Sequence, residues 1–288
     1  MSNITVLGVV AAAAAIPLVA NTLGNIIGNT INRLRERRGT PPRPPRGIPL
    51  EEMRTNAQQA LNMNIENYIN FAFCGSQNSG KSTLINYLRE IDDTGVYNNN
   101  ELDAARVGET QTTRETRAYG FIEGHDLDFV RFWDHAGCGT FDHPTEDYFE
   151  QNLLYAFDCI LLVTASGLGE YERTILEDAR RFETDVVIVI NKADERVQSK
   201  LRRRPRHLGP PDANARKLII QETINEAKAS ITEDLRNIQQ EQVPVFVVSA
   251  HKWRDYQFSH SEEDKDLSME IVPMIEYILT AAFRRRAP

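Results

Sequence analysis

A glycine-rich turn is the first stretch of this sequence whose residue types could do chemistry. The residues "GSQNSGKS", from Gly75 to Ser82, fit the pattern G-x-x-x-x-G-K-S between an apolar run and a helix-like one. In that context the backbone N–H groups of the turn and of the helix start bind phosphate oxygens. Gly80 allows a close backbone approach, Lys81 reaches the β- and γ-phosphates, and Ser82 ligates Mg²⁺. The nucleotide contacts expected here are Ser76, Gln77, Asn78, Ser79, Gly80, Lys81, Ser82 and Thr83.

A second motif predicts which base the site binds. The tetrapeptide "NKAD", residues 191–194, follows the apolar run "DVVIVI", and ligands of a parallel sheet bind at the carboxyl ends of its strands. Asp194 can accept hydrogen bonds from N1–H and N2–H₂ of guanine, a pair of donors that adenine lacks. We expect Asn191 to contact the edge of the ring and the stem of Lys192 to cover its face.

A backbone donor to guanine O6 is predicted from "VSAHK", residues 248–252, which ends the next apolar run. The donor is the N–H group of Ala250 or of His251. The residues assigned to the base site in this stretch are Ser249, Ala250 and His251. A phosphate-binding turn followed by these two motifs predicts that the bound ligand is GTP or GDP.

The stretch "FWDHAGCGT", residues 132–140, has the form Asp-x-x-Gly after an apolar run. We expect Asp134 to hold Mg²⁺ through water and the N–H group of Gly137 to contact the γ-phosphate. Many GTPases carry a glutamine next, which orients the attacking water, but here the residue is Cys138. Two interpretations stay open: an enzyme that positions the water by other means, and a binding module that barely hydrolyses GTP.

The loop ahead of this switch, "VGETQTTRETRAY", offers three hydroxyl groups for the metal. We expect one of Thr110, Thr112 and Thr113 to contact Mg²⁺, and we favour Thr113. The predicted catalytic residues are Lys81, Thr113 and Gly137. The predicted metal ligands are Ser82, Thr113 and Asp134.

Three histidines and a basic stretch are less specific. A histidine in a polar loop is more often solvated than catalytic, and we interpret His135, His143 and His251 in this way. The stretch "RVQSKLRRRPRHLGPP", residues 196–211, is predicted to be a basic loop. Contact with anionic lipid and a solvated insertion are both open for this loop, and the insertion is favoured.

These motifs need a framework that brings the ends of several strands together. Apolar runs predict six strands, at residues 68–75, 117–123, 127–133, 157–166, 185–192 and 244–250. Helix-like stretches occupy 81–91, about 143–156, 170–182 and 212–239, and another begins near 267. This alternation predicts a parallel sheet covered on both faces. The short "EGHD" turn joins the second and third runs as an antiparallel hairpin. The predicted fold is therefore α/β, a Ras-like P-loop GTPase domain with a mostly parallel six-stranded sheet.

The beginning of the chain differs in composition from the rest. Residues 4–28 are apolar and long enough to cross a bilayer. The net charge is −8 over 288 residues, yet residues 1–50 carry six Arg and one Glu. A basic neck on an acidic body argues against a nucleic-acid partner and for a localised basic contact. We predict a membrane-associating segment at 1–32, a basic Pro-rich linker at 33–50 and a G domain at 51–288.

The location that follows is the cytoplasmic face of a membrane, because the basic residues come after the apolar segment. Spanning the bilayer and shallow insertion are both open for this segment. Packing of the segment on the body would instead leave the protein in the cytosol.

Three stretches together resemble the immunity-related GTPases: "GSQNSGKSTLINYLR", "VGETQTTRETRAY" and "FWDHAGCGTFDHPTEDYFEQNLLYAFDCILLVTAS". The family pairs a long P-loop helix and a Thr-rich switch with a "WDxPGxGT" switch that is followed by Pro and Tyr. The resemblance is strongest over residues 68–195. It implies a dynamin-like mode, in which GTP-loaded molecules self-assemble on membranes and assembly triggers hydrolysis. Many members act on vacuoles that enclose intracellular pathogens.

Several residues depart from the family pattern. Ala136 stands where the family usually has Pro, and Asn191 stands where its guanine motif usually begins with Thr. Gln111 aligns with the glutamate implicated in hydrolysis that a partner molecule activates. Lys81 places the chain with the branch that carries Lys in its P-loop. The family also has a long helical domain after its G domain. The stretch after Ala250 leaves room for one helix, so we expect that domain to be absent.

The predicted function is Mg²⁺-dependent hydrolysis of GTP, activated by self-association at a membrane, with a second copy or a related GTPase as the partner. A role in cell-autonomous defence follows only from the family analogy. The first rival is a non-hydrolysing, GTP-loaded adaptor that regulates related GTPases. The second is another GTPase family, septin-like or ribosome-assembly, and the lack of a long basic extension counts against the latter.

Overall fold

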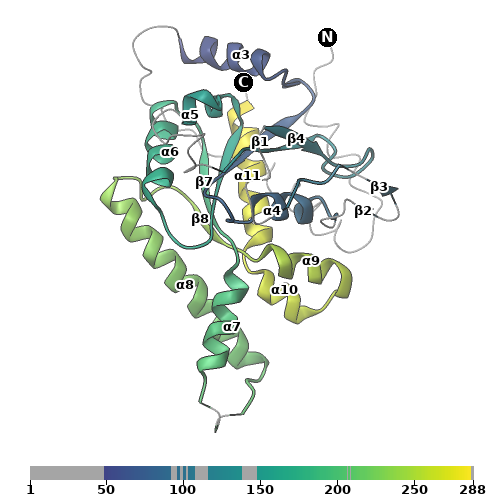
Figure 1. Ribbon diagram of the computed structural model, residues 1–288, viewed down its shortest axis with the longest axis vertical. Coiled ribbons are helices and arrows are strands. Elements are labelled where there is room, and N and C mark those ends of the chain that lie inside the picture. The colour runs from purple at the N-terminus through teal and green to yellow at the C-terminus, as the bar shows by residue number, and fades with distance from the viewer. Residues whose placement is uncertain are drawn as a thin grey trace.

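The computed structural model describes residues 49–91, 96–97, 100–101, 103–107, 116–137, 148–205, 207 and 209–286. Its main sheet has six strands in the order β4-β5-β1-β6-β7-β8. The strands are β1 (Ile69–Cys74), β4 (Arg117–Gly120), β5 (Val130–Asp134), β6 (Cys159–Thr164), β7 (Val186–Ile190) and β8 (Val245–Val247). The β4–β5 pair is antiparallel and the other neighbours are parallel. The predicted sheet, hairpin included, is confirmed (Figure 1). A separate two-stranded ribbon joins β2 (Val96–Tyr97) to β3 (Asn100–Glu101).

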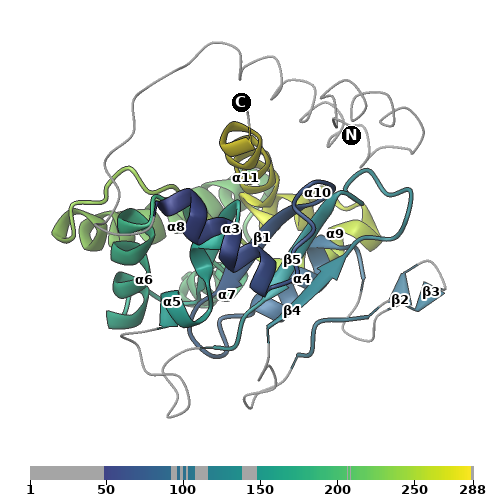
Figure 2. The same ribbon diagram turned by 90° about the horizontal axis from the view of Figure 1, so that it is seen from above.

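Helices cover both faces of this sheet because its central strands are apolar on both sides. Along β1, Phe71 and Phe73 enter one core, whereas Ala72 and Cys74 enter the other. The first core is closed by α4 (Lys81–Leu88), α9 (Ala250–Ser259) and α11 (Ile271–Arg286). The second is closed by α3 (Leu50–Ala60), α5 (Tyr148–Gln151), α6 (Glu170–Arg181), α7 (Ala193–Arg203) and α8 (Ala213–Asn237). A continuous apolar run is typical of a strand buried on both faces. Figure 2 shows the two helix layers from above.

The prediction of a basic loop over residues 196–211 is wrong for its first half, since α7 continues to Arg203. Val197 and Leu201 stand four residues apart and pack on the core, beneath a basic outer face. Lys200 also pairs with Glu226 of α8 at 2.8 Å. Acidic residues in the first turn and basic ones in the last favour a helix here.

The prediction of one helix after Ala250 is also wrong. Three helices follow this point: α9, α10 (Glu262–Ser268) and α11. Two of these helices are short, and each begins at a serine cap. Ser249 and Ser261 accept a backbone N–H at the start of α9 and α10, which allows two separate helices to form before α11.

The start of the described chain adds a helix that the strand-and-helix pattern did not predict. α3 packs Leu50 and Ala57 on the core, and Arg54 donates to the carbonyls of Phe182 and Glu183 at 2.9 and 2.8 Å. Residues 143–147 of the predicted helix near 143–156 lie outside the described residues, and its described part consists of α5 followed by the 3₁₀ turn η1 (Leu154–Ala156). The predicted segment 1–32 and nearly all of the linker lie outside the described residues. Among the helices described from Leu50 onward, none combines the length and apolarity that a membrane span requires.

Candidate functional site

The glycine-rich turn leaves β1 at its carboxyl end and leads into α4. Two of its glycines are required by geometry. Gly75 has φ +140°, and a Cβ there would lie 2.0 Å from the carbonyl oxygen of Val163. Gly80 has φ +86°, and a Cβ there would lie 2.5 Å from Nδ2 of Asn191. Lys81 Nζ donates to the carbonyls of Gly75 and Ser76 at 2.9 and 3.0 Å, so the cation lies along the inside of the turn.

Two of the predicted metal ligands lie side by side. Ser82 Oγ, at the start of α4, donates to Oδ2 of Asp134 at the end of β5 over 2.7 Å. Asp134 is fully buried. A hydroxyl and a carboxylate are the hard oxygen donors that Mg²⁺ prefers, so this pair fits the predicted metal. Thr113, the third predicted ligand, lies outside the described residues, as do Thr110, Thr112 and Cys138.

Asn191 joins the phosphate turn to the base loop, a role that sequence reasoning missed. Its Nδ2 donates to the carbonyls of Ser79 and Gly80 at 3.2 and 3.4 Å, and its Oδ1 accepts from the N–H of Ala250 at 3.1 Å. The side chain is buried. Its amide is thus engaged with protein groups on both sides, and its predicted contact with the edge of the base stays a prediction. The sequence feature that could have predicted this bridge is the short polar side chain of Asn191 at the end of a strand, from which it can reach both neighbouring loops.

The other predicted base contacts gather beside Asn191. Asp194, in the first turn of α7, accepts from Ser249 Oγ at 2.7 Å. Ser249 is fully buried, and its Oγ also accepts from the N–H of Lys252, so it fixes one oxygen of the Asp194 carboxylate and the start of α9 together. Lys192 has φ +59° and caps α7. His251 is exposed, with its ring 5.6 Å from that of Tyr87.

His135 is not solvated as predicted, because it is fully buried. Its Nδ1 lies 3.1 Å from Thr116 Oγ1 and 3.4 Å from Asn152 Oδ1, and its ring meets the edge of Phe157. Burial lowers the pKa of His135 to about 4, despite the opposing hydrogen bond with Asn152. The imidazole is therefore neutral near pH 7. Its contact with Thr116 joins the Asp-x-x-Gly stretch to the start of β4. His143 lies outside the described residues.

One turn of α6 contacts the phosphate turn directly and the Asp-x-x-Gly stretch through Tyr148 of α5, and sequence reasoning missed it too. Glu172, which is buried, accepts from Ser76 Oγ and from the N–H of Gly169. Its neighbour Tyr171 packs edge-on against Tyr148 with ring centroids 5.2 Å apart. Tyr148 in turn donates its hydroxyl to the carbonyl of Ala136 at 2.6 Å. The Gly169–Glu172 contact is a local capping box, whereas the Ser76–Glu172 contact joins segments distant in sequence, and no local motif predicts it.

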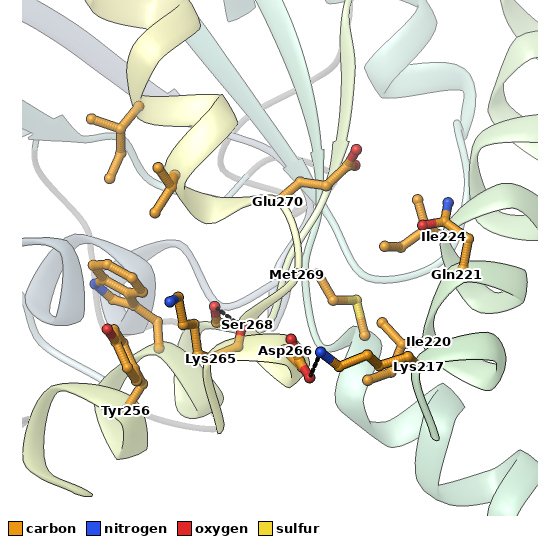
Figure 3. Close-up of a pocket in the computed structure, with 13 residues that line it drawn as sticks. Lys217, Ile220, Gln221, Ile224, Tyr256, Lys265, Asp266, Ser268, Met269 and Glu270 are labelled. Atoms are coloured by element: carbon orange, nitrogen blue, oxygen red, sulfur yellow. Dashed lines mark hydrogen bonds and ion pairs between the residues drawn. The ribbon is translucent and has the colours of Figure 1, made fainter. Parts of the chain in front are cut away.

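A separate cavity of about 520 Å³ lies behind the base loop, among α8, α9, α10 and α11. Figure 3 shows the ion pair that Lys217 of α8 makes there with Asp266 of α10 at 3.3 Å. Met269 also lines the cavity, and its backbone bridges to Val248 at the start of the base loop. None of the predicted nucleotide contacts lines this cavity. Its wall therefore supports the base loop from behind.

Comparison with known proteins gives relatives for the described body. A family model described as interferon-inducible GTPase (IIGP) matches residues 49–280. Interferon-gamma-inducible GTPase 10 of Mus musculus is 24% identical over 194 residues, which are 67% of this chain and 42% of that protein. Interferon-inducible GTPase 1 of Mus musculus is 27% identical over 137 residues, 48% of this chain and 31% of that protein. The chain thus spans less than half the length of these curated relatives.

Two solved structures are similar at low identity. The LeoA bacterial dynamin GTPase from ETEC gives a TM-score of 0.46 at 14% identity, covering 97% of this chain and 43% of that one. A dimerization-deficient mutant of Toc33 from Arabidopsis thaliana gives 0.45 at 13% identity, covering 82% of this chain and 93% of that one. At these scores they add nothing to the argument for the site.

Proposed function

The chain belongs to the interferon-inducible GTPase family, and from this premise we propose that it binds GTP with Mg²⁺ and hydrolyses it to GDP. The observation that carries the proposal is the buried Asn191 bridge between the phosphate turn and the base loop. It holds the two halves of a nucleotide site at a fixed spacing. Beside it, Ser249 leaves one oxygen of the Asp194 carboxylate for the donors of a guanine edge.

Different residues of the site bind the phosphates and the metal ion. Backbone N–H groups at the start of α4 receive phosphate oxygens at the positive end of the helix dipole. Lys81 neutralises charge on the β- and γ-phosphates once it exchanges its carbonyl partners for them. Ser82 and Asp134 would hold the Mg²⁺ ion, which supplies electrostatic stabilisation of the transferring phosphoryl group when bound. The close approach of Gly137 to Gln77 of the turn supports the proposed contact between its N–H group and the γ-phosphate.

Hydrolysis by an isolated molecule is expected to be slow, because Cys138 replaces the glutamine that orients water in many GTPases. We therefore propose that a second G domain, of this chain or of a related GTPase, completes the site. Apolar residues 4–28 support assembly at the cytoplasmic face of a membrane. A role in cell-autonomous defence is consistent with the interferon-inducible relatives. The same cysteine favours the second candidate, a GTP-loaded adaptor without turnover.

GTP turnover measured across protein concentration separates these candidates. The hydrolase proposal predicts a specific activity that rises with concentration. Tight binding of GTP without turnover at any concentration would favour the adaptor. Lys81→Ala is the control for the site, because a charge-assisted contact is worth about 1.5–3 kcal/mol. Its loss should weaken GTP binding by about tenfold or more. Unchanged affinity in this variant would contradict the assignment of the phosphate turn.

A further inference from the structure

The second residue of the phosphate turn is held by a carboxylate from another element. Glu172 of α6 is only 3% exposed, and one of its oxygens accepts from Ser76 Oγ. The other oxygen accepts from the N–H of Gly169 at 3.0 Å. Both oxygens are therefore engaged and the carboxylate cannot rotate freely. It holds the hydroxyl of Ser76, the residue that precedes Gln77 in the turn.

Gln77 lies where the phosphate turn meets the Asp-x-x-Gly stretch. A Cβ placed on Gly137 would be 3.2 Å from Cα of Gln77 and 3.6 Å from its Cβ. The Gln77 side chain therefore leaves the turn beside Gly137. It is exposed and makes no hydrogen bond with the residues that the structure describes. An exposed amide beside Gly137 can reach a ligand at the γ-phosphate end of the site.

We propose that Gln77 orients the water that attacks the γ-phosphate, and that Glu172 positions Gln77 through Ser76. This inference rests on GTP hydrolysis as the proposed function. A glutamine amide has the acceptor and the donor that the task requires, whereas a cysteine thiol is weak in both respects. The residue type missing at position 138 is thus present on the facing loop, where the second G domain of the proposed function would hold the exposed Gln77 side chain against the γ-phosphate.

The step needs only water and the nucleotide. Oε1 of Gln77 accepts a hydrogen bond from the water, and Nε2 donates to a γ-phosphate oxygen. The water oxygen bonds to phosphorus as the bond from phosphorus to the GDP oxygen breaks. The proton of the water passes to a phosphate oxygen, so the products are GDP and inorganic phosphate. Glu172 touches none of the reacting atoms, and its role is positioning.

Single-turnover hydrolysis and GTP affinity, measured on the full chain at one high protein concentration, test the proposal. Gln77→Ala should lower the rate on the order of tenfold or more and leave the dissociation constant within about twofold, because the contact of Oε1 with the attacking water acts on the transition state and adds little to the binding of GTP. Glu172→Gln should lower the rate less. Glu177→Gln, on the exposed face of the same helix, is the matched control and should keep the wild-type rate.

A double-mutant cycle distinguishes positioning from a structural effect. In the Gln77→Ala background, Glu172→Gln should change the rate little, because the residue it positions is gone. Ser76→Ala breaks the same bond from the other side and should reproduce the Glu172→Gln result. If wild-type protein turns over and Gln77→Ala keeps its rate, the inference is wrong and the proposed function stands. Absence of turnover in the wild type would overturn both.

Discussion

A single neutral histidine lies at the centre of the switch region. His135 is fully buried between the end of β5, Thr116 and Asn152, and Lys81 is the nearby charge that acts on it. Desolvation makes the imidazolium form costly here, and a cation close by adds to that cost. Its pKa is lowered to about 4, against an ordinary value of 6.5. The unfolded chain therefore binds a proton in a pH range where the folded chain does not.

This difference predicts a pH dependence of stability. Above pH 6.5 the contribution of His135 is fully present, and it is lost as the pH falls toward 4, because protons then favour the unfolded state. The full effect is on the order of 3 kcal/mol. Denaturant unfolding at several pH values checks it, with His135→Gln as the reference. The wild-type advantage should shrink on acidification. A difference between the two proteins that is constant from pH 7 to 4.5 would contradict the assignment.

At the scale of elements, α11 is tied to the amino end of the sheet by its last described residue. Arg286 donates to both carboxylate oxygens of Asp158, each at 2.6 Å, and to the carbonyls of Ile65 and Tyr68. Asp158 also accepts from the N–H of Asn70 at 2.7 Å. It precedes β6 and is largely buried. The paired guanidinium and carboxylate thus hold α11 across the edge where β1 and β6 begin.

Removal of the guanidinium should leave a buried, uncompensated carboxylate. We expect Arg286→Ala to lower the free energy of unfolding by about 2–3 kcal/mol, below the range for a fully buried pair because Arg286 is partly exposed. Arg284→Ala, an exposed arginine on the same helix, should change it by less than about 0.5 kcal/mol. Chemical denaturation of both variants makes the comparison. Equal stability of the two would show that the pair adds nothing.

The helices and strands also show which parts of the fold can be predicted from the sequence alone. Strand positions and the loops at their ends follow from local apolar runs and from spacing, and all six strands are found. α7 was missed because its basic outer face hides the Val197 and Leu201 pair. The Asn191 bridge and the Glu172 contact were missed for another reason. They join segments about a hundred residues apart, and only the folded sheet brings those segments together.

At the scale of the whole molecule, the described residues from Pro49 onward supply the phosphate turn, the base loop and the Ser82–Asp134 pair of the candidate site. The β1 and α4 elements, the base loop and α6 supply the described contacts of that site. The apolar segment is thus expected to govern location and not nucleotide affinity.

Deletion of residues 1–32 tests this division. The truncated protein should move from the membrane fraction to the soluble fraction and keep the GDP affinity of the full chain. Fractionation of cell lysates and a nucleotide titration give the two readouts. Full-length protein that is soluble with every nucleotide would mean that the segment packs on the body.

The most direct test of a guanine site is the base preference measured at Asp194. Calorimetric titration should show that the wild-type protein binds GDP and binds ADP far more weakly, because adenine lacks the paired donors that the carboxylate accepts. Asp194→Asn should lose about tenfold or more in GDP affinity and gain affinity for xanthosine diphosphate, whose ring presents an oxygen where guanine presents its amino group. Equal binding of ADP and GDP by the wild type, or an Asp194→Asn protein with an unchanged preference, would contradict the account.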